Sequence, residues 1–157
     1  MPICLDIGVV SKNDIQRPFE KLTYPYKRLN TPWKIDILTD PDRPGDAFNS
    51  YEGGSDTILR DFLETSIQGF SISFGATSAL MTVLPPKAFG SPRKLWRILV
   101  EGADEWGAAD MDEIFNFPGI QYVIESYDDT MDIEQLEFVT KENFPWGAYG
   151  LIAARIH

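Results

Sequence analysis

Apolar side chains alternate with polar ones over several short segments of this chain, and turn residues separate these segments. Phe70, Ile72 and Phe74 alternate with Ser71 and Ser73, and a second apolar segment follows a four-residue turn, which predicts a β-hairpin. A period of two is typical of half-buried strands. The predicted strands are residues 3–10, 33–39, 70–74, 79–84, 120–125, 132–140 and 151–156.

Three segments carry the signals of helices, which are a capping side chain at the start and apolar residues on one face. The clearest start is Ser91 followed by Pro92, because proline at the first helical position gives up no intrahelical hydrogen bond. Asp110, with Glu113 three residues later, resembles a capping box. The predicted helices are residues 55–68, 91–105 and 110–115.

Two stretches fit neither pattern. Residues 11–32 contain three prolines and are predicted to be irregular, and residues 40–54 are predicted to form a turn-rich loop. The hairpins and helices do not alternate regularly as in a parallel α/β fold. A chain of 157 residues is long enough for one core and short for two. The prediction is therefore a single α+β domain over residues 1–157, with a mainly antiparallel sheet and two or three helices packed on it.

The charges are distributed very unevenly along the chain. Residues 98–140, which we call the acidic window, contain no Lys or Arg and twelve carboxylates. The formal net charge is −10, so the window's −12 leaves about +2 on the remaining residues. A concentrated negative field favours cationic partners and disfavours nucleic acid and anionic membranes. The twelve carboxylates are Glu101, Asp104, Glu105, Asp110, Asp112, Glu113, Glu125, Asp128, Asp129, Asp132, Glu134 and Glu137.

Residue types for the common catalytic centres are scarce. The only histidine, His157, is the last residue, where we expect a frayed end rather than a base for a Ser or Cys nucleophile. One Cys and one His cannot form a typical zinc site. Cys4 lies in an apolar segment and is predicted to be a core residue, and a single cysteine fits the cytoplasm. We predict no catalytic residue, metal or cofactor, and a protein that is not an enzyme.

A calcium-binding loop is one alternative for the turn-rich stretch. Asp40, Asp42 and Gly45 match the first, third and sixth positions of such a loop. Pro44 occupies the fifth ligand position, however, and Tyr51 the twelfth, where a bidentate Glu belongs. Asp residues among prolines are more typical of turns, which is the preferred interpretation.

Basic residues form two clusters outside the acidic window. Between residues 17 and 33 they alternate with aromatic ones, which would suit single-stranded nucleic acid, but aromatic side chains covering one edge of the core are the preferred interpretation. The second cluster stands at the start of the predicted 91–105 helix, against the preference of the helix dipole, so either function or a tertiary ion pair is expected there. It consists of Lys87, Arg93, Lys94 and Arg97.

Aromatic residues are interleaved with the carboxylates of the acidic window. Interfaces draw much of their binding energy from Trp and Tyr. Trp106 lies in a small-residue loop between carboxylates and is the predicted contact point. The predicted partner-binding residues are Glu101, Asp104, Glu105, Trp106, Asp110, Asp112, Glu113, Tyr127, Asp128 and Asp129.

A small acidic chain without a catalytic set is typical of immunity proteins and antitoxins. We therefore predict a non-catalytic protein that inhibits or neutralises a basic partner, such as a toxin or a nucleic-acid-acting enzyme, and that contacts neither nucleic acid nor membrane directly. One alternative is a small carboxylate- and metal-dependent enzyme. Its candidate carboxylates are the pair Asp128 and Asp129 and the group Asp110, Asp112 and Glu113. Another is a scaffold or oligomeric structural subunit.

Overall fold

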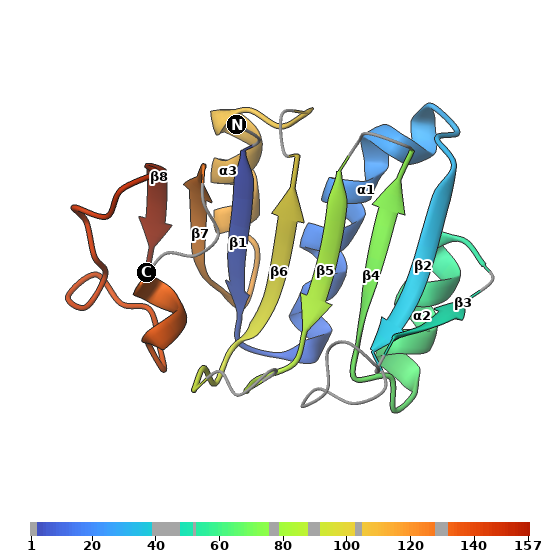
Figure 1. Cartoon of the computed structure of the whole chain (residues 1–157), viewed down its shortest axis with the longest axis horizontal. Coiled ribbons are helices and arrows are strands. Elements are labelled where there is room, and N and C mark those ends of the chain that lie inside the picture. Colours follow the sequence, from blue (N-terminus) through green and yellow to red (C-terminus); the bar gives the residue numbers. More distant parts are fainter. Residues whose placement is uncertain are drawn as a thin grey trace.

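The chain forms an antiparallel sheet with helices on one of its faces (Figure 1). The computed structural model describes residues 3–38, 48–51, 53–75, 79–87, 92–102, 105–127 and 132–157. Eight strands lie in the order β3-β2-β4-β5-β6-β1-β7-β8, and each neighbouring pair is antiparallel. The strands are β1 (Cys4–Val9), β2 (Trp33–Leu38), β3 (Phe48–Tyr51), β4 (Gly69–Phe74), β5 (Leu80–Leu84), β6 (Trp96–Glu101), β7 (Ile120–Ser126) and β8 (Leu151–Ile156). The helices are α1 (Gln16–Arg28), α2 (Ser55–Glu64) and α3 (Ala108–Phe115), with 3-10 turns η1 (Lys12–Ile15) and η4 (Asp132–Gln135).

The predicted α+β class with a mainly antiparallel sheet is confirmed. Most of the period-two segments are strands, and the predicted hairpin is β4–β5. The helix predicted at 55–68 is α2, which ends at Glu64 because the backbone of Thr65 is extended. The Thr65 N–H makes the last helical hydrogen bond, to the Asp61 carbonyl. Of the predicted loop 40–54, residues 48–51 form the edge strand β3, and residues 40–47 lie outside the described residues.

The prediction of an irregular segment at 11–32 is wrong, because residues 16–28 form α1. Pro18 lies in the first turn of this helix, where backbone N–H groups have no intrahelical partner in any case. Pro25 lies near the other end and removes a single hydrogen bond. Phe19, Leu22 and Tyr26 bury one face of the helix, and this burial outweighs the cost of the prolines.

The prediction of a helix at 91–105 is also wrong. Ser91, its proposed cap, lies outside the described residues, and residues 96–101 form β6. Ile98 and Val100 point to the helix-covered face, while Arg97 lies on the opposite face in contact with Asp6. The alternation and the β-branched residues therefore outweigh the capping signal.

The strand predicted at 132–140 is wrong as well. The chain leaves the sheet there, forms η4, and continues without regular structure. Ile133, Val139 and Phe144 pack on Tyr122 and Ile124 of β7 and form a second apolar cluster. The segment thus acts as a cover for one part of the sheet.

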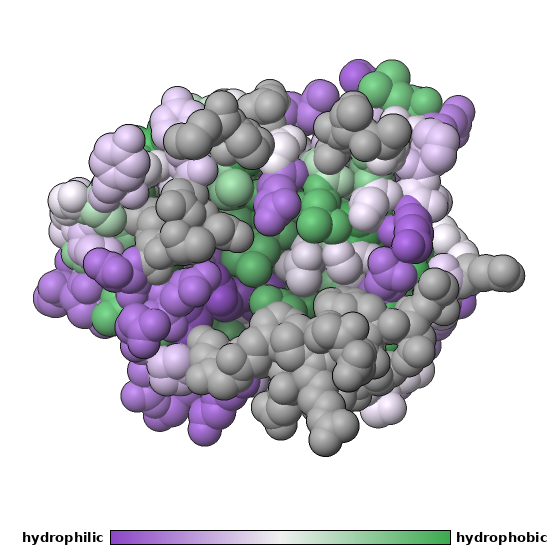
Figure 2. Space-filling model, in the orientation of Figure 1, coloured by the Kyte–Doolittle hydropathy of each residue, from purple (hydrophilic) through white to green (hydrophobic). Residues whose placement is uncertain are grey.

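The two faces of the sheet have different covers. Helices α1, α2 and α3 lie behind the sheet in Figure 1 and enclose the main core, where Phe62 and Phe19 pack edge-to-face on Phe70 with centroid distances of 5.2 and 5.6 Å. We call the opposite face the open face. Residues 132–150 cover it over β7 and β8, whereas its middle presents an apolar area with hydrophilic residues around it (Figure 2). Among the described residues, every helix is too short or too polar to cross a membrane.

Candidate functional site

The acidic window becomes one region of the folded chain. Its residues contribute β6, α3, β7 and η4, and α3 packs directly on β7. Strands β6 and β7 flank β1, so the carboxylates gather around one half of the sheet instead of spreading over the molecule. The side chains of Asp104, Asp128 and Asp129 lie outside the described residues.

Basic residues from outside the window neutralise part of this charge. Lys21 of α1 pairs with Asp110 at 3.1 Å and also with Glu113, both on α3. The hydrogen bond with Glu113 raises the pKa of Lys21 above its usual value. The Gly107 N–H donates to the Asp110 carboxylate at 3.0 Å, and this bond and Lys21 hold the pKa of Asp110 below its usual value. One cation facing two carboxylates leaves a net charge of about −1.

A second cation repeats this arrangement at the edge of the sheet. Arg155 of β8 pairs with Asp112 of α3 and, at 3.4 Å, with Glu125 of β7. It therefore joins three elements and again leaves one carboxylate charge in excess. Glu101 and Glu105 are exposed and form no ion pair within the described part of the chain.

Trp106, the predicted contact point, lies in the main core. Its side chain is only 9% exposed, and its ring meets Tyr26 edge-to-face at a centroid distance of 6.0 Å. The indole N–H is buried and has no hydrogen-bond partner among the described residues. Because so little of the ring reaches the surface, Trp106 is not a suitable anchor for a partner.

Other aromatic side chains are exposed beside β8, and the sequence reasoning singled out only one of them. Tyr127, a predicted site residue, is 45% exposed, Trp146 is 52% exposed and Tyr149 is 92% exposed. The Tyr127 N–H donates to the Gly150 carbonyl at 2.8 Å, which brings residues 127 and 149 together. The Trp146 Nε1–H donates to the Lys141 carbonyl at 3.1 Å, which orients the indole. The turn at residues 145–147 was the available signal for an exposed Trp.

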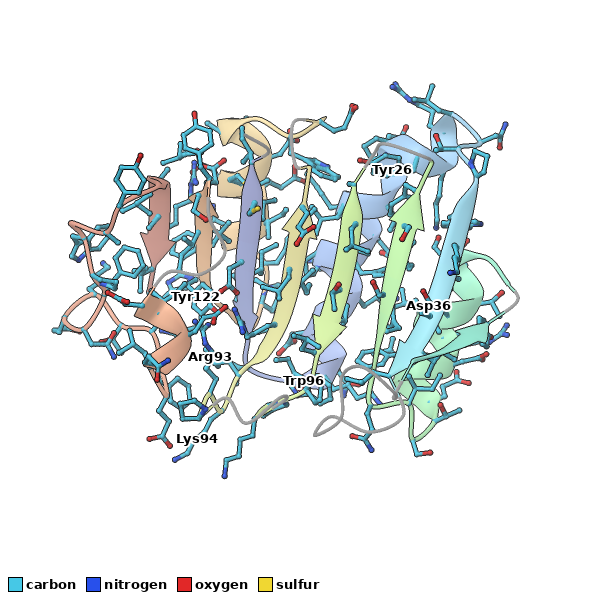
Figure 3. All side chains as sticks on the ribbon, in the orientation of Figure 1. Tyr26, Asp36, Arg93, Lys94, Trp96 and Tyr122 are labelled. Carbon is cyan, nitrogen blue, oxygen red and sulfur yellow. The ribbon has the colours of Figure 1, made fainter. Side chains whose placement is uncertain are left out.

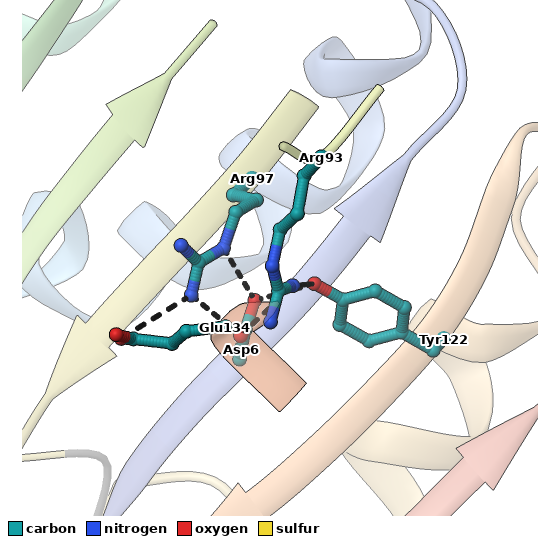
Figure 4. A network of polar contacts seen from close by, with 5 residues as sticks. All are labelled: Asp6, Arg93, Arg97, Tyr122 and Glu134. Atoms are coloured by element: carbon teal, nitrogen blue, oxygen red, sulfur yellow. Dashed lines mark hydrogen bonds and ion pairs between the residues drawn. The ribbon is translucent and has the colours of Figure 1, made fainter. Parts of the chain in front are cut away.

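The second basic cluster supplies a buried polar network (Figures 3 and 4). Arg97 donates to Asp6 at 2.8 Å, Tyr122 donates to Asp6 at 2.8 Å, and Arg93 donates to the Tyr122 hydroxyl. Glu134 of η4 approaches Arg97 at 4.0 Å, so the network also contacts the segment 132–150 that covers β7 and β8. Of the two explanations left open for this cluster, the tertiary ion pair is the one observed.

Burial and charge act in opposite directions on this network. Burial alone would raise the pKa of Asp6, but the attraction of Arg97 and Arg93 and the hydrogen bonds it accepts lower that pKa overall. Burial raises the pKa of Tyr122 strongly, and the neighbouring Asp6 carboxylate adds to this effect. Both groups therefore keep one protonation state near neutral pH. Such a network stabilises the fold and supplies no group poised for proton transfer.

Residues of the first basic cluster, between positions 17 and 33, also make contacts within the fold. Phe19 and Tyr26 are buried, which fits the preferred interpretation of its aromatic residues as core. Lys21 serves α3 as described, Lys27 pairs with Asp56 of α2, and Arg17 lies over the Phe117 ring at 5.7 Å.

The remaining candidates for chemistry have structural surroundings. Cys4 is buried, as predicted. The expectation of a frayed end at His157 is wrong. Its ring stacks on the Phe115 ring at a centroid distance of 4.0 Å, and its backbone N–H donates to the Gln121 carbonyl at 3.1 Å. Among the described residues, no three His, Cys, Asp or Glu side chains are grouped so as to hold a metal ion. The calcium-loop alternative at 40–45 lies outside the described residues. Comparison of this chain with protein-family models, curated proteins and solved structures finds no match.

Proposed function

We propose that this protein binds a basic protein and inhibits or neutralises it, without catalysis of its own. The observation that carries the proposal is the negative charge that remains around the acidic window after internal pairing. Lys21 and Arg155 each face two carboxylates, and Glu101 and Glu105 add two exposed carboxylates that form no ion pair with any described residue. A field of this kind accelerates association with a cationic partner and selects against other partners.

Exposed aromatic side chains supply what charge alone does not. Ion pairs at the rim of an interface contribute little affinity, whereas Trp and Tyr that become buried on binding contribute much of it. Tyr127, Trp146 and Tyr149 lie in the same half of the molecule as the acidic window and are exposed. Immunity proteins and antitoxins are the functional class that combines small size, acidic surface and a basic target.

The test is capture of a partner by the tagged protein from a lysate of its source cells, with charge variants as comparison. Glu101→Lys combined with Glu105→Lys reverses two exposed charges of the acidic window. Asp56→Lys combined with Glu64→Lys is the matched control, because it changes the net charge equally at two exposed sites of α2, outside the acidic window. We expect a stoichiometric basic protein that the wild type and the control retain and that the window variant releases at lower salt.

Two results would refute the proposal. One is the absence of any stoichiometric basic protein from the wild-type capture. The other is equal retention of that protein by the window variant and the control, because binding would then be independent of the acidic window.

A further inference from the structure

The middle of the open face contains a pocket that the internal packing leaves unfilled. It has a volume of about 60 Å³ and lies between β5, β6 and β1, with η4 as one wall. Leu80, Leu99, Ile124 and Ile133 give it apolar walls. It opens in the apolar area near the centre of the face shown in Figure 2.

The polar side chains of this pocket favour a cation. Among the described residues, Asp6 and Glu101 are its carboxylates, Thr82 and Ser126 contribute hydroxyl groups, and no Lys, Arg or His lines it. Asp6 already faces Arg93 and Arg97 and is close to neutralised. Glu101 is different, because it is exposed and forms no ion pair within the described residues.

Glu101 is the exposed carboxylate of the pocket. It is the last residue of β6, and its neighbours across the sheet are Cys4 on β1 and Leu80 on β5, which also line the pocket. Its side chain therefore lines the pocket together with the apolar residues Leu80 and Leu99. A side chain with an aliphatic stem and a cationic end matches this combination of walls and charge.

The size of the pocket agrees with such a side chain. A cavity needs at least about 10–15 Å³ to hold one water molecule, so a volume of about 60 Å³ leaves room for several atoms of a ligand. The outer part of a lysine side chain, from Cγ to Nζ, has four heavy atoms, and the outer part of arginine is similar in size.

We propose that this pocket receives a lysine or arginine side chain of the partner protein. The stem packs between Leu80, Leu99 and Ile133, and the cationic end pairs with Glu101 beside the Thr82 hydroxyl. The identity of the donor as a partner protein rests on the proposed function. The preference of the pocket for a cationic side chain is independent of the proposed function, and it is testable without the partner.

The experiment is an NMR titration of the isotope-labelled protein with blocked tripeptides Gly-Lys-Gly, Gly-Arg-Gly and Gly-norleucine-Gly. We expect the lysine and arginine peptides to shift the methyl signals of Leu80, Leu99 and Ile133, and norleucine to bind about three- to fivefold more weakly, the scale of an exposed ion pair. Glu101→Gln should weaken lysine binding by the same factor, whereas Glu105→Gln, an exposed carboxylate outside the pocket, should leave it unchanged. Leu99→Trp should fill the pocket and abolish the shifts, with an otherwise folded spectrum.

The inference is overturned if the pocket methyls do not respond, if norleucine binds as well as lysine, or if Glu101→Gln has no effect. The outcome is separable from that of the proposed function. Peptide binding without a captured basic protein refutes the function and retains the pocket's cation preference. A captured partner that binds Leu99→Trp as tightly as wild type retains the function and refutes the role of the pocket.

Discussion

Replacing Asp6 by Asn should destabilise the protein strongly. Asp6 is the carboxylate that Arg93 and Arg97 share, and both of these Arg side chains are almost completely buried. Asn keeps the shape and one acceptor oxygen but removes the charge, so Arg93 and Arg97 each lose an ion pair in the interior. Removing one partner of a buried ion pair costs about 3–5 kcal/mol. That loss is a large part of the roughly 5–15 kcal/mol that stabilises a domain.

The assay is equilibrium unfolding in urea, followed by tryptophan fluorescence. Asp36→Asn is the matched control, because Asp36 also lies on the open face, in β2, and its partner Lys34 is exposed and 3.9 Å away (Figure 3). Its loss should stay within about 1 kcal/mol. In an Arg97→Met background the cost of Asp6→Asn should fall, because fewer buried charges lose a partner.

The pH dependence gives an independent check on the same residue. The pKa of Asp6 is lowered in the folded state, so its contribution is fully present above the unfolded value of about 3.9 and is lost as the pH falls through the folded value. Asp6→Asn should lack this component of the acid destabilisation. A loss below about 1 kcal/mol, or an unchanged acid profile, would refute the account of the network.

Three further outcomes are expected. Trp106→Ala should lower the free energy of unfolding in urea by about 3–5 kcal/mol, as for a core aromatic residue. Trp146→Ala should change it by less than about 1 kcal/mol and weaken partner binding. The reverse pattern would contradict the assignment of Trp106 to the core and Trp146 to the surface. Gly8→Ala should lower stability by about 1–3 kcal/mol, because its Cβ would lie 2.2 Å from the Tyr122 ring, while Gly147→Ala, with no atom within 4 Å of the added Cβ, is the control. Reversing Glu101 and Glu105 to Lys should slow association with a captured partner without lowering the melting temperature, and an unchanged rate would exclude steering by these charges.

The sequence predicted the parts of the fold that depend on local alternation. Strands β2 and β4 alternate apolar and polar residues, and both were predicted. The apolar strand β5 was predicted as the second strand of the hairpin that begins with β4. Helix α1 was missed because its prolines count against a helix locally, and the burial that offsets them is tertiary. β6 was missed because Ser91 and Pro92 are a strong local signal for a helix start, whereas β6 itself is a short, largely apolar segment without regular polar alternation.

The candidate site was predictable only as far as sequence neighbours are also spatial neighbours. The acidic window is visible in the sequence because its residues are consecutive. It is also one region of the structure because β6, α3 and β7 lie close together. Its internal neutralisation by Lys21 and Arg155 depends on contacts between distant segments and left no local signal. The same holds for exposure, since nothing around Trp106 and Trp146 reveals that the first is core and the second is surface.

The position of β1 between β6 and β7 has a consequence for how the chain folds. Asp6 lies 91 residues from Arg97 and 116 residues from Tyr122, so β1 pairs only after a very long loop closes. The β4–β5 hairpin and its neighbours have partners close in sequence and are able to assemble earlier. Until β1 inserts, the sheet exists as two parts whose edges at β6 and β7 are unpaired. Those transient edges are where this protein is most exposed to misfolding and aggregation during synthesis.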